Sequence, residues 1–348
     1  MSEHRLAGEV SSALSHFMLI GLSAILGDTD RRVGAPMAAR CHWTDEVTPV
    51  PVLSTDLTAD EIDETVRAHA VRHAGPDSWV QAVTSAGSRC GSALFSPRAK
   101  VPLLHEWSDY VRERTHFLDS HPVNQLDRRL LAGLGEPAWW RCDERSATPD
   151  GGASRWEMKT RNRGEEFVLN RLAPLAHVVS ERAAGSIWAG LVGHTERDEH
   201  GSDSTGSRSA TGLRTPGPTD NAVAWCALWG LSVVPTIHQA DQDTANRGYS
   251  QSPGVWPRNR VHPDQHALPV FTSPVSVSRL RSILVTAVFD EVAFAGVTDP
   301  ASSSPSAGAA RRQLQQWGVR AVVRFPVRQT GSASAPERQL LTGSLEVL

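Results

Sequence analysis

The apolar positions near the start of the chain predict a helix followed by a strand. Across residues 11–26 they recur with the spacing of one broad helical face, at Leu14, Phe17, Met18, Leu22, Ile25 and Leu26. In residues 38–45, Ala39, Cys41 and Trp43 alternate with polar residues, which is the period of a half-buried strand. A helix that leads into a strand favours an α/β or α+β domain.

Three more helices follow from the same pattern. Thr58 and Glu61 form a capping-box pattern at the start of a helix whose buried face carries Ile62, Val66 and Ala70. Residues 103–118 and 165–182 have apolar positions at helical spacing, and Pro174 is expected to kink or divide the second of these segments.

The second half of the chain alternates polar stretches with compact apolar segments. Residues 195–219 are rich in Gly, Ser and Thr and predict a long, flexible surface loop. Thr219 or Asp220 can then cap an apolar helix, and residues 299–308 have the composition of a linker. Residues 309–317 predict a short helix that Gly318 ends, before a strand from Val319.

These segments predict the overall organisation. We expect an α/β or α+β fold with a mixed sheet, several packed helices and long irregular loops. The predicted units are an N-terminal α/β domain (1–194), a flexible polar loop (195–219) and a C-terminal α+β region (220–348) with its linker near 299–308.

Composition narrows the function classes. The net charge of −3 argues against a protein that coats nucleic acid through bulk electrostatics, although the distribution is uneven. Residues 1–80 carry a net charge of −6, and residues 311–348 one of +4. The early apolar stretch is too short to span a membrane and lacks the features of a signal peptide, which predicts a cytoplasmic protein. The four cysteines are scattered, so we expect reduced, mostly buried thiols.

The segment 139–163 concentrates tryptophans and cations. Guanidinium groups beside flat aromatic side chains suit phosphate contact and base stacking. The alternative is a solvated turn whose tryptophans anchor a core. The first interpretation makes these residues the candidate nucleic-acid contacts: Arg155, Trp156, Lys159, Arg161 and Arg163.

Further arginines extend this candidate surface. The predicted strand from Val319 alternates apolar residues with Arg320 and Arg324, and this face could follow a row of phosphates. An edge strand protected from aggregation by charge would have the same sequence. Arg208 and Arg214 in the polar loop complete the set of candidate contacts.

The common catalytic patterns are absent from the sequence. It contains no phosphate loop, no G-x-G-x-x-G, no G-x-S-x-G and no H-E-x-x-H. Two groups of His and Asp could in principle ligate a metal, but their loop context argues against both, and no metal or cofactor is expected. The groups are His194, Asp198, His200 and Asp203, and the HPDQH segment with His262, Asp264 and His266.

Several pieces of the chain together resemble a known family. They are the helix HFMLIGLSAIL, the strand that ends in HW, the block from Trp139 to SRWEMKTRNRG, and the helix WCALWGL. In this order they resemble the accessory and large-subunit-like proteins of type I-U (I-G) CRISPR effector complexes. The most specific part is the block, through Trp139, Trp140, Asp143, Gly151, Gly152 and Lys159.

The resemblance implies a non-catalytic subunit of an RNA-guided surveillance complex in antiviral defence. Such a subunit would bind guide RNA or target DNA and dock on other CRISPR effector subunits, with sequence reading left to base pairing. Two alternatives remain open. One is a metal-dependent hydrolase or nuclease built on the loop from His194 to Asp203, and the other is a protein-interaction scaffold that uses exposed tryptophans.

Overall fold

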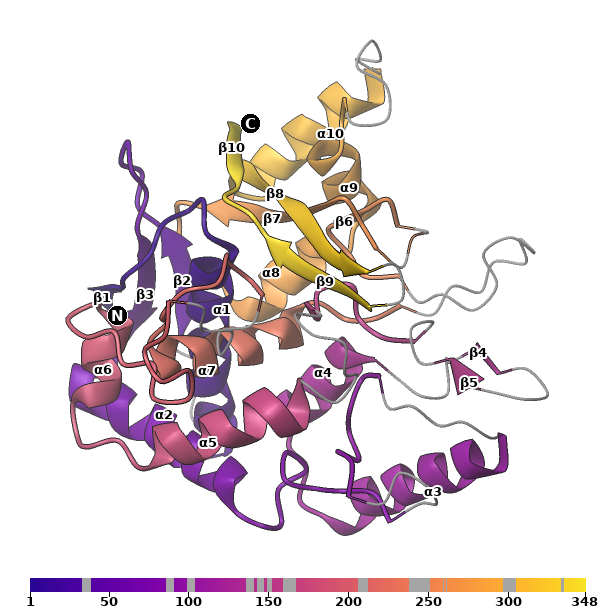
Figure 1. Cartoon of the computed structure of the whole chain (residues 1–348). Coiled ribbons are helices and arrows are strands. Elements are labelled where there is room, and N and C mark those ends of the chain that lie inside the picture. The colour runs from indigo at the N-terminus through magenta and orange to yellow at the C-terminus, as the bar shows by residue number, and fades with distance from the viewer. Residues whose placement is uncertain are drawn as a thin grey trace.

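The computed structural model describes residues 1–32, 39–85, 91–98, 104–135, 141–142, 147–148, 152–158, 167–205, 212–237, 251–258, 260, 262–296, 305–332 and 335–348. Helices and strands both contribute to the fold, so the predicted α/β or α+β class is confirmed. Every pairing between the described strands is antiparallel, which makes the fold an α+β arrangement with antiparallel sheets in place of the expected mixed sheet. Figure 1 shows a small sheet on one side, a larger sheet on the other, and helices between and below them.

The smaller sheet has the strand order β1-β3-β2, and the long helix α1 packs beside it. The alternation at Cys41 and Trp43 forms a strand as predicted, because both side chains turn into the core. An isolated bridge from Cys41 to Val275 connects this sheet to the segment that follows β7 (Gln265–Phe271), a strand of the larger sheet. The elements are β1 (Ser2–Arg5), α1 (Ala13–Arg32), β2 (Arg40–Trp43) and β3 (Pro51–Thr55).

A group of helices covers the lower part of the molecule in Figure 1. The predicted capping box is present, since Thr58 accepts from the Glu61 N–H and the Glu61 side chain accepts from the Thr58 N–H. Pro174 lies where the π-helical turn η4 passes directly into the first turn of α5, so the predicted segment changes from one type of helix to another at this proline. The elements are α2 (Ala59–Ala74), α3 (Leu104–Ser120), α4 (Gln125–Leu134), η4 (Val168–Leu172), α5 (Ala173–Ser180) and α6 (Ser186–Leu191).

The larger sheet has the order β10-β8-β7-β6, with β9 paired to the far end of β8. The predicted strand from Val319 is its long central strand. The elements are β6 (Val255–Trp256), β7 (Gln265–Phe271), α8 (Val277–Leu284), α9 (Ala287–Ala293), α10 (Pro305–Gln316), β8 (Val319–Ser332), β9 (Ala335–Leu340) and β10 (Ser344–Val347). A short hairpin of β4 (Arg141–Cys142) and β5 (Ala147–Thr148) stands apart from both sheets.

Helix α1 crosses α7 (Asn221–Gly230) at backbone contact, with η5 (Leu231–Val233) following. A Cβ at Gly21 would lie 1.8 Å from the Cys226 carbonyl oxygen, and one at Gly230 would lie 2.2 Å from the Phe17 carbonyl oxygen. Glycine at both positions therefore permits the crossing. The predicted cap of α7 is confirmed at Asp220, which accepts from the Ala222 N–H.

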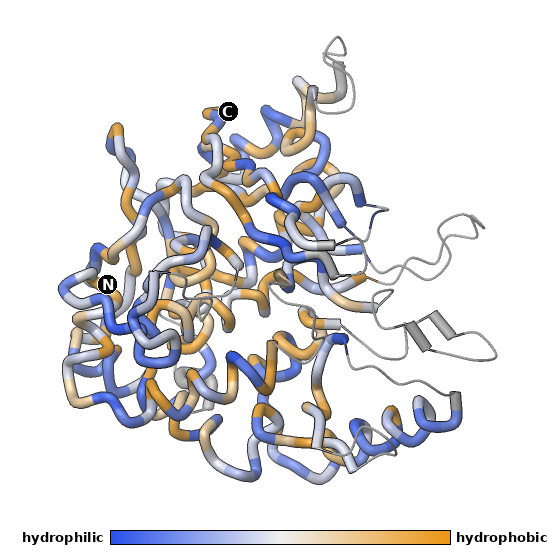
Figure 2. The backbone as a smooth tube through the Cα atoms, viewed as in Figure 1, coloured by the Kyte–Doolittle hydropathy of each residue, from blue (hydrophilic) through white to orange (hydrophobic). Residues whose placement is uncertain are grey.

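The crossing joins the two halves of the chain into one interior. Buried apolar side chains from both sides of the polar loop belong to a single hydrophobic core, and Figure 2 shows apolar positions gathered toward the inside. The predicted domain boundaries stay a prediction.

The described cysteines Cys41 and Cys226 are buried and have free thiols, and burial raises the pKa of the Cys41 thiol to about 12. Within the described ranges, no helix has the length and apolarity needed to cross a membrane.

Candidate nucleic-acid interface

The prediction that Arg155 and Trp156 contact nucleic acid is wrong, because both side chains are fully buried. The Trp156 indole donates to the Pro253 carbonyl oxygen at 2.7 Å and packs edge-on against Phe17 and His266. The interpretation of this turn as a core anchor is therefore correct for Trp156.

Arg155 is buried close to Arg338, one of several buried arginines that surround Glu157. Glu157 pairs with Arg98 at 2.6 Å and also interacts with Arg171 and Arg338. Burial opposes its ionisation, but these cations hold the pKa of the Glu157 carboxyl below its usual value. Burial, together with the charges of Arg98 and Arg155, lowers the pKa of Arg338 to about 9 against the opposing charge of Glu157.

Lys159, Arg161, Arg163 and Arg208 lie outside the described residues, as do Trp139 and Trp140. The assignment of the first four as nucleic-acid contacts stays a prediction. Arg214 is described and half-buried, and it lines an open pocket beside Gly8 and Thr195. The structure therefore does not bring Arg214 together with the buried Arg155.

The two arginines of β8 have different surroundings. The Arg324 guanidinium donates to the carbonyl oxygens of Val292 and Ala293 and pairs with Glu346, so its donors are used inside the fold. Arg320 is exposed and lies 3.9 Å from Asp45. Because β8 has neighbours on both sides, the interpretation of this segment as an edge strand is wrong.

The His and Asp groups of the sequence hold one another or the backbone. Asp198 is fully buried and accepts from the Gly201 N–H and the Asn221 amide, and His200 donates to the Asn170 carbonyl oxygen. His266 lies in β7 and donates to the Arg155 carbonyl oxygen at 3.0 Å. Among the described residues, no three His, Cys, Asp or Glu side chains form a group that could hold a metal ion.

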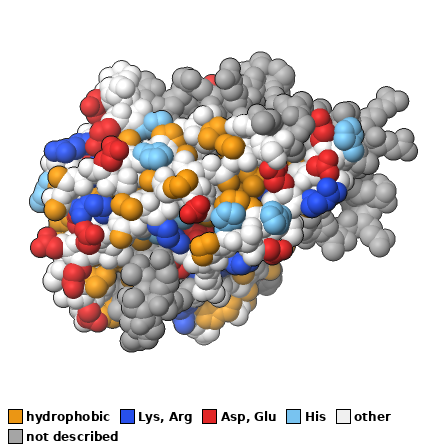
Figure 3. All heavy atoms as spheres, turned by 90° about the horizontal axis from the view of Figure 1, so that it is seen from below, with side chains coloured by type: hydrophobic (Ala, Val, Ile, Leu, Met, Phe, Trp, Pro, Cys, Tyr) orange, Lys and Arg blue, Asp and Glu red, His pale blue; other side chains and the backbone are white. Residues whose placement is uncertain are grey.

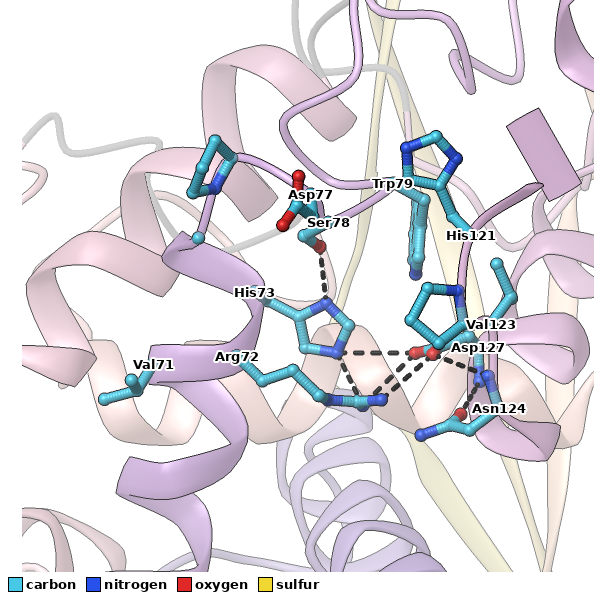
Figure 4. A pocket seen from close by; sticks show the side chains of 13 residues that line it. Val71, Arg72, His73, Asp77, Ser78, Trp79, His121, Val123, Asn124 and Asp127 are labelled. Carbon is cyan, nitrogen blue, oxygen red and sulfur yellow. Dashed lines mark hydrogen bonds and ion pairs between the residues drawn. The ribbon is translucent and has the colours of Figure 1, made fainter.

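A pocket of about 520 Å³ opens between the end of α2 and the start of α4, and we call it the His73 pocket (Figure 4). The buried carboxylate of Asp127 lies at its base, where it accepts two hydrogen bonds from Arg72 and lies 3.3 Å from His73. Asp127 also accepts from the Asn124 N–H as part of the capping box of α4. Burial opposes ionisation, but the charge of Arg72 and the Asn124 N–H help to hold the pKa of the Asp127 carboxyl below its usual value.

Ser78, His73 and Asp127 have the composition of a catalytic triad, but their hydrogen bonds differ from one. The closest neighbour of His73 Nε2 is an Arg72 nitrogen at 2.7 Å, which can only donate. His73 Nε2 is then the acceptor, and Nδ1–H donates to Ser78 Oγ at 2.9 Å. In this tautomer His73 has no free lone pair to remove a proton from Ser78, so the arrangement ties α2 to α4.

A second pocket, of about 450 Å³, lies between the ends of β2, β7 and α10, and we call it the arginine pocket. Two guanidinium groups line it, with two serines and an indole, and none of its lining residues is acidic. The Arg40 side chain is exposed and forms no hydrogen bond or ion pair within the described part of the chain. The lining residues are Arg40, Phe271, Ser273, Pro274, Val275, Ser276, Arg279, Gln316, Trp317 and Gly318.

Local structure fixes the arginine pocket from three sides. The bridge between Cys41 and Val275 holds the start of β2 against the loop that leads into α8. Ser276 caps α8 by accepting from the Arg279 N–H, and the Arg279 guanidinium donates to the Trp317 carbonyl oxygen at 3.0 Å. Gly318, with a φ of +87°, turns the chain from α10 into β8. Arg279 therefore has a defined position and still has N–H groups to offer.

Sequence reasoning missed this pocket because its residues come from three separate segments of the chain. The only local signal is the pair of cations Arg279 and Arg281 without acids in the helix that follows Ser276. By contrast, Lys and Arg are interspersed with Asp and Glu on the described part of the face in Figure 3. The arginine pocket therefore differs from that face, because its described lining residues include two arginines and no acidic residue.

Comparisons with protein-family models, with curated proteins and with solved structures give no match.

Proposed function

We propose that this chain is a non-catalytic subunit of a type I-U CRISPR RNA-guided surveillance complex, and that it contacts nucleic acid through the arginine pocket. The resemblance of the segment from Trp139 to Gly164 supports the assignment to such a complex. One observation carries the nucleic-acid contact, namely the two arginines that line a pocket whose described lining residues include no carboxylate. Guanidinium groups bind phosphate through two parallel hydrogen bonds, and an indole offers a stacking surface.

The overall charge of the chain fits a local contact rather than a coating role. With a net charge of −3, the protein has no bulk attraction for a polyanion, so binding depends on a small number of placed cations. In an RNA-guided complex such contacts go to the backbone, while base pairing reads the sequence. Lys159, Arg161 and Arg163 are proposed as additional contacts, together with the exposed Arg320.

A salt titration of oligonucleotide binding tests the contact. Single-stranded RNA and DNA should bind the protein with an affinity that falls as salt rises from about 50 to about 200 mM. The double variant Arg40→Ala/Arg279→Ala should bind more weakly and with a salt slope smaller by roughly 1 to 2, because two phosphate contacts are lost. Arg112→Ala is the matched control, since Arg112 is an exposed arginine that already pairs with Asp109.

Equal affinity of the double variant and the wild-type protein would refute the arginine pocket as the contact. Arg161→Ala/Arg163→Ala, measured in the same way, decides whether the tryptophan–arginine block contributes. A protein that purifies without nucleic acid, and that binds none at about 50 mM salt, would favour the scaffold alternative.

Co-expression with the other subunits of a type I-U effector complex and a guide RNA tests the assembly. The full chain should purify with the guide RNA and its neighbouring subunits through size-exclusion chromatography. Separate elution of the chain from an otherwise complete complex would contradict the assignment. The double variant separates the two claims, because loss of the phosphate contacts alone should still permit docking on protein subunits.

A further inference from the structure

We infer that the arginine pocket binds a phosphomonoester, the terminal phosphate of a nucleotide, in preference to the phosphodiesters inside a strand. This inference rests on the proposed function for the pocket's role, and it specifies the chemistry of its ligand. A terminal phosphate is available from two sources, the end of a strand and a free mononucleotide. The experiment below distinguishes them.

The shape of the pocket favours a single group over a length of backbone. Its volume of about 450 Å³ lies in the range of roughly 300–1,000 Å³ that small-molecule sites occupy. Its walls come from the start of β2, the loop between β7 and α8, and the end of α10. A pocket with walls on three sides suits a group at the end of a strand.

The charge of the pocket matches that of a phosphomonoester. A phosphomonoester carries about −1.5 to −2 at neutral pH, whereas a diester carries only a single negative charge. Arg40 and Arg279 supply two positive charges, and none of the pocket's lining residues is acidic. The first backbone N–H groups of α8, next to Ser276, add a partial positive charge.

The neutral groups of the pocket provide the remaining contacts of a nucleotide. Ser276 Oγ accepts from the Arg279 N–H, which leaves its hydroxyl hydrogen to donate to a phosphate oxygen. The half-buried Trp317 offers an aromatic side chain on which a base can stack. Because Arg279 bonds the Trp317 carbonyl oxygen, the phosphate contact and the indole are held in one arrangement.

The test compares one oligonucleotide in three forms, with a 5′-phosphate, with a 3′-phosphate, and with hydroxyl groups at both ends. Wild-type protein should bind one phosphorylated form about tenfold or more tightly than the hydroxyl form. The variants Arg40→Gln and Arg279→Gln should remove most of this preference, and Arg112→Gln should keep it. Competition with a nucleoside monophosphate, with the nucleoside as control, identifies the source. Displacement of the phosphorylated strand at comparable concentrations points to a free mononucleotide, and failure to displace it points to a strand end.

Two results separate this inference from the proposed function. If all three forms bind equally, and the variants weaken all three, the pocket binds internal phosphates and the inference is overturned while the proposed function stands. If the protein binds nucleoside monophosphate with the predicted loss in both variants but binds no strand, the inference stands and the proposed function fails. Unchanged binding in both variants overturns both.

Discussion

The His73 pocket and the arginine pocket are similar in volume and each contains arginine, yet the two differ in how that arginine is held. In the His73 pocket, Arg72 is bound by Asp127, whose carboxylate is only 2% exposed and also caps α4. In the arginine pocket, neither Arg40 nor Arg279 has a carboxylate partner within the described residues. The comparison teaches that charge pairing, more than pocket size, separates an arginine that holds the fold together from one that is available to a ligand.

The largest effect is expected at the base of the His73 pocket. Asp127→Ala should reduce the free energy of unfolding by about 3–5 kcal/mol, because it leaves Arg72 without its carboxylate partner and removes a cap of α4. Chemical denaturation at neutral pH measures the loss. Asp109→Ala is the control, since its pair with Arg112 is exposed and worth at most about 1 kcal/mol. Equal effects of the two variants would contradict the structural role assigned to Asp127.

The free energy of unfolding should decrease at acidic pH, because two histidines are buried in the core. Burial lowers the pKa of His266 to about 3 and that of His16 to about 4, from an ordinary value of 6.5. The unfolded chain therefore takes up protons below pH 6.5 that the folded chain does not. Stability is complete above that pH and falls as pH decreases, by about 3 kcal/mol for the two residues together at pH 5.5.

Denaturation curves at pH 7 and pH 5.5 check this prediction. His266→Gln should reduce the difference between the two curves by about half, whatever its own cost at pH 7. An unchanged difference would show that His266 does not titrate in this way. The comparison of the two pockets is best made at or above pH 7, where neither histidine affects it.

A substitution in the arginine pocket should have little effect on stability and a large effect on ligand affinity, unlike Asp127→Ala in the His73 pocket. Arg279→Ala is expected to cost less than about 1 kcal/mol in unfolding free energy, because among the described residues its side chain makes one hydrogen bond and no ion pair. The same change should reduce oligonucleotide affinity about tenfold. Denaturation and binding titrations on one preparation measure both. A large loss of stability with unchanged binding would remove the distinction between the pockets.

A small effect is also expected at Ser78. Ser78→Ala removes the acceptor for both the His73 Nδ1–H and the Val80 N–H, with an expected cost of about 1 kcal/mol. Denaturation measures it against Ser282→Ala on the exposed face of α8. A serine-reactive fluorophosphonate should not label Ser78, because His73 lacks the free lone pair that activation requires. Specific labelling that Ser78→Ala abolishes would show the other tautomer and a nucleophilic role.

Local patterns predicted the elements of the fold well. The helical face from Leu14 to Leu26, the capping box at Thr58 and the strand from Val319 all depend on neighbours within a few residues, which a sequence displays directly. The candidate site was harder, because the exposure of Arg155 and Trp156 depends on distant partners. Ser252 and His266 hydrogen-bond the Arg155 backbone and Pro253 accepts from the Trp156 indole, and no periodicity near residue 155 reveals these partners.

The arginine pocket could not be found from sequence for a related reason. Arg40 and Arg279 are far apart in the chain, and the bridge between β2 and the start of α8 brings them together. A sequence shows where cations gather along the chain, but it does not show which cations lack a carboxylate in space. Only the folded arrangement gives the second kind of information.

The crossing of α1 and α7 has a consequence for how the protein is made. Two hundred residues separate Gly21 from its contacts near Cys226 and Gly230, so α1 cannot reach its final packing until α7 has left the ribosome. Until then, the apolar face that carries Phe17, Leu22 and Ile25 lacks the cover that α7 provides. Nascent chains that stop short of α7 should therefore engage chaperones, whereas chains that extend past it should not.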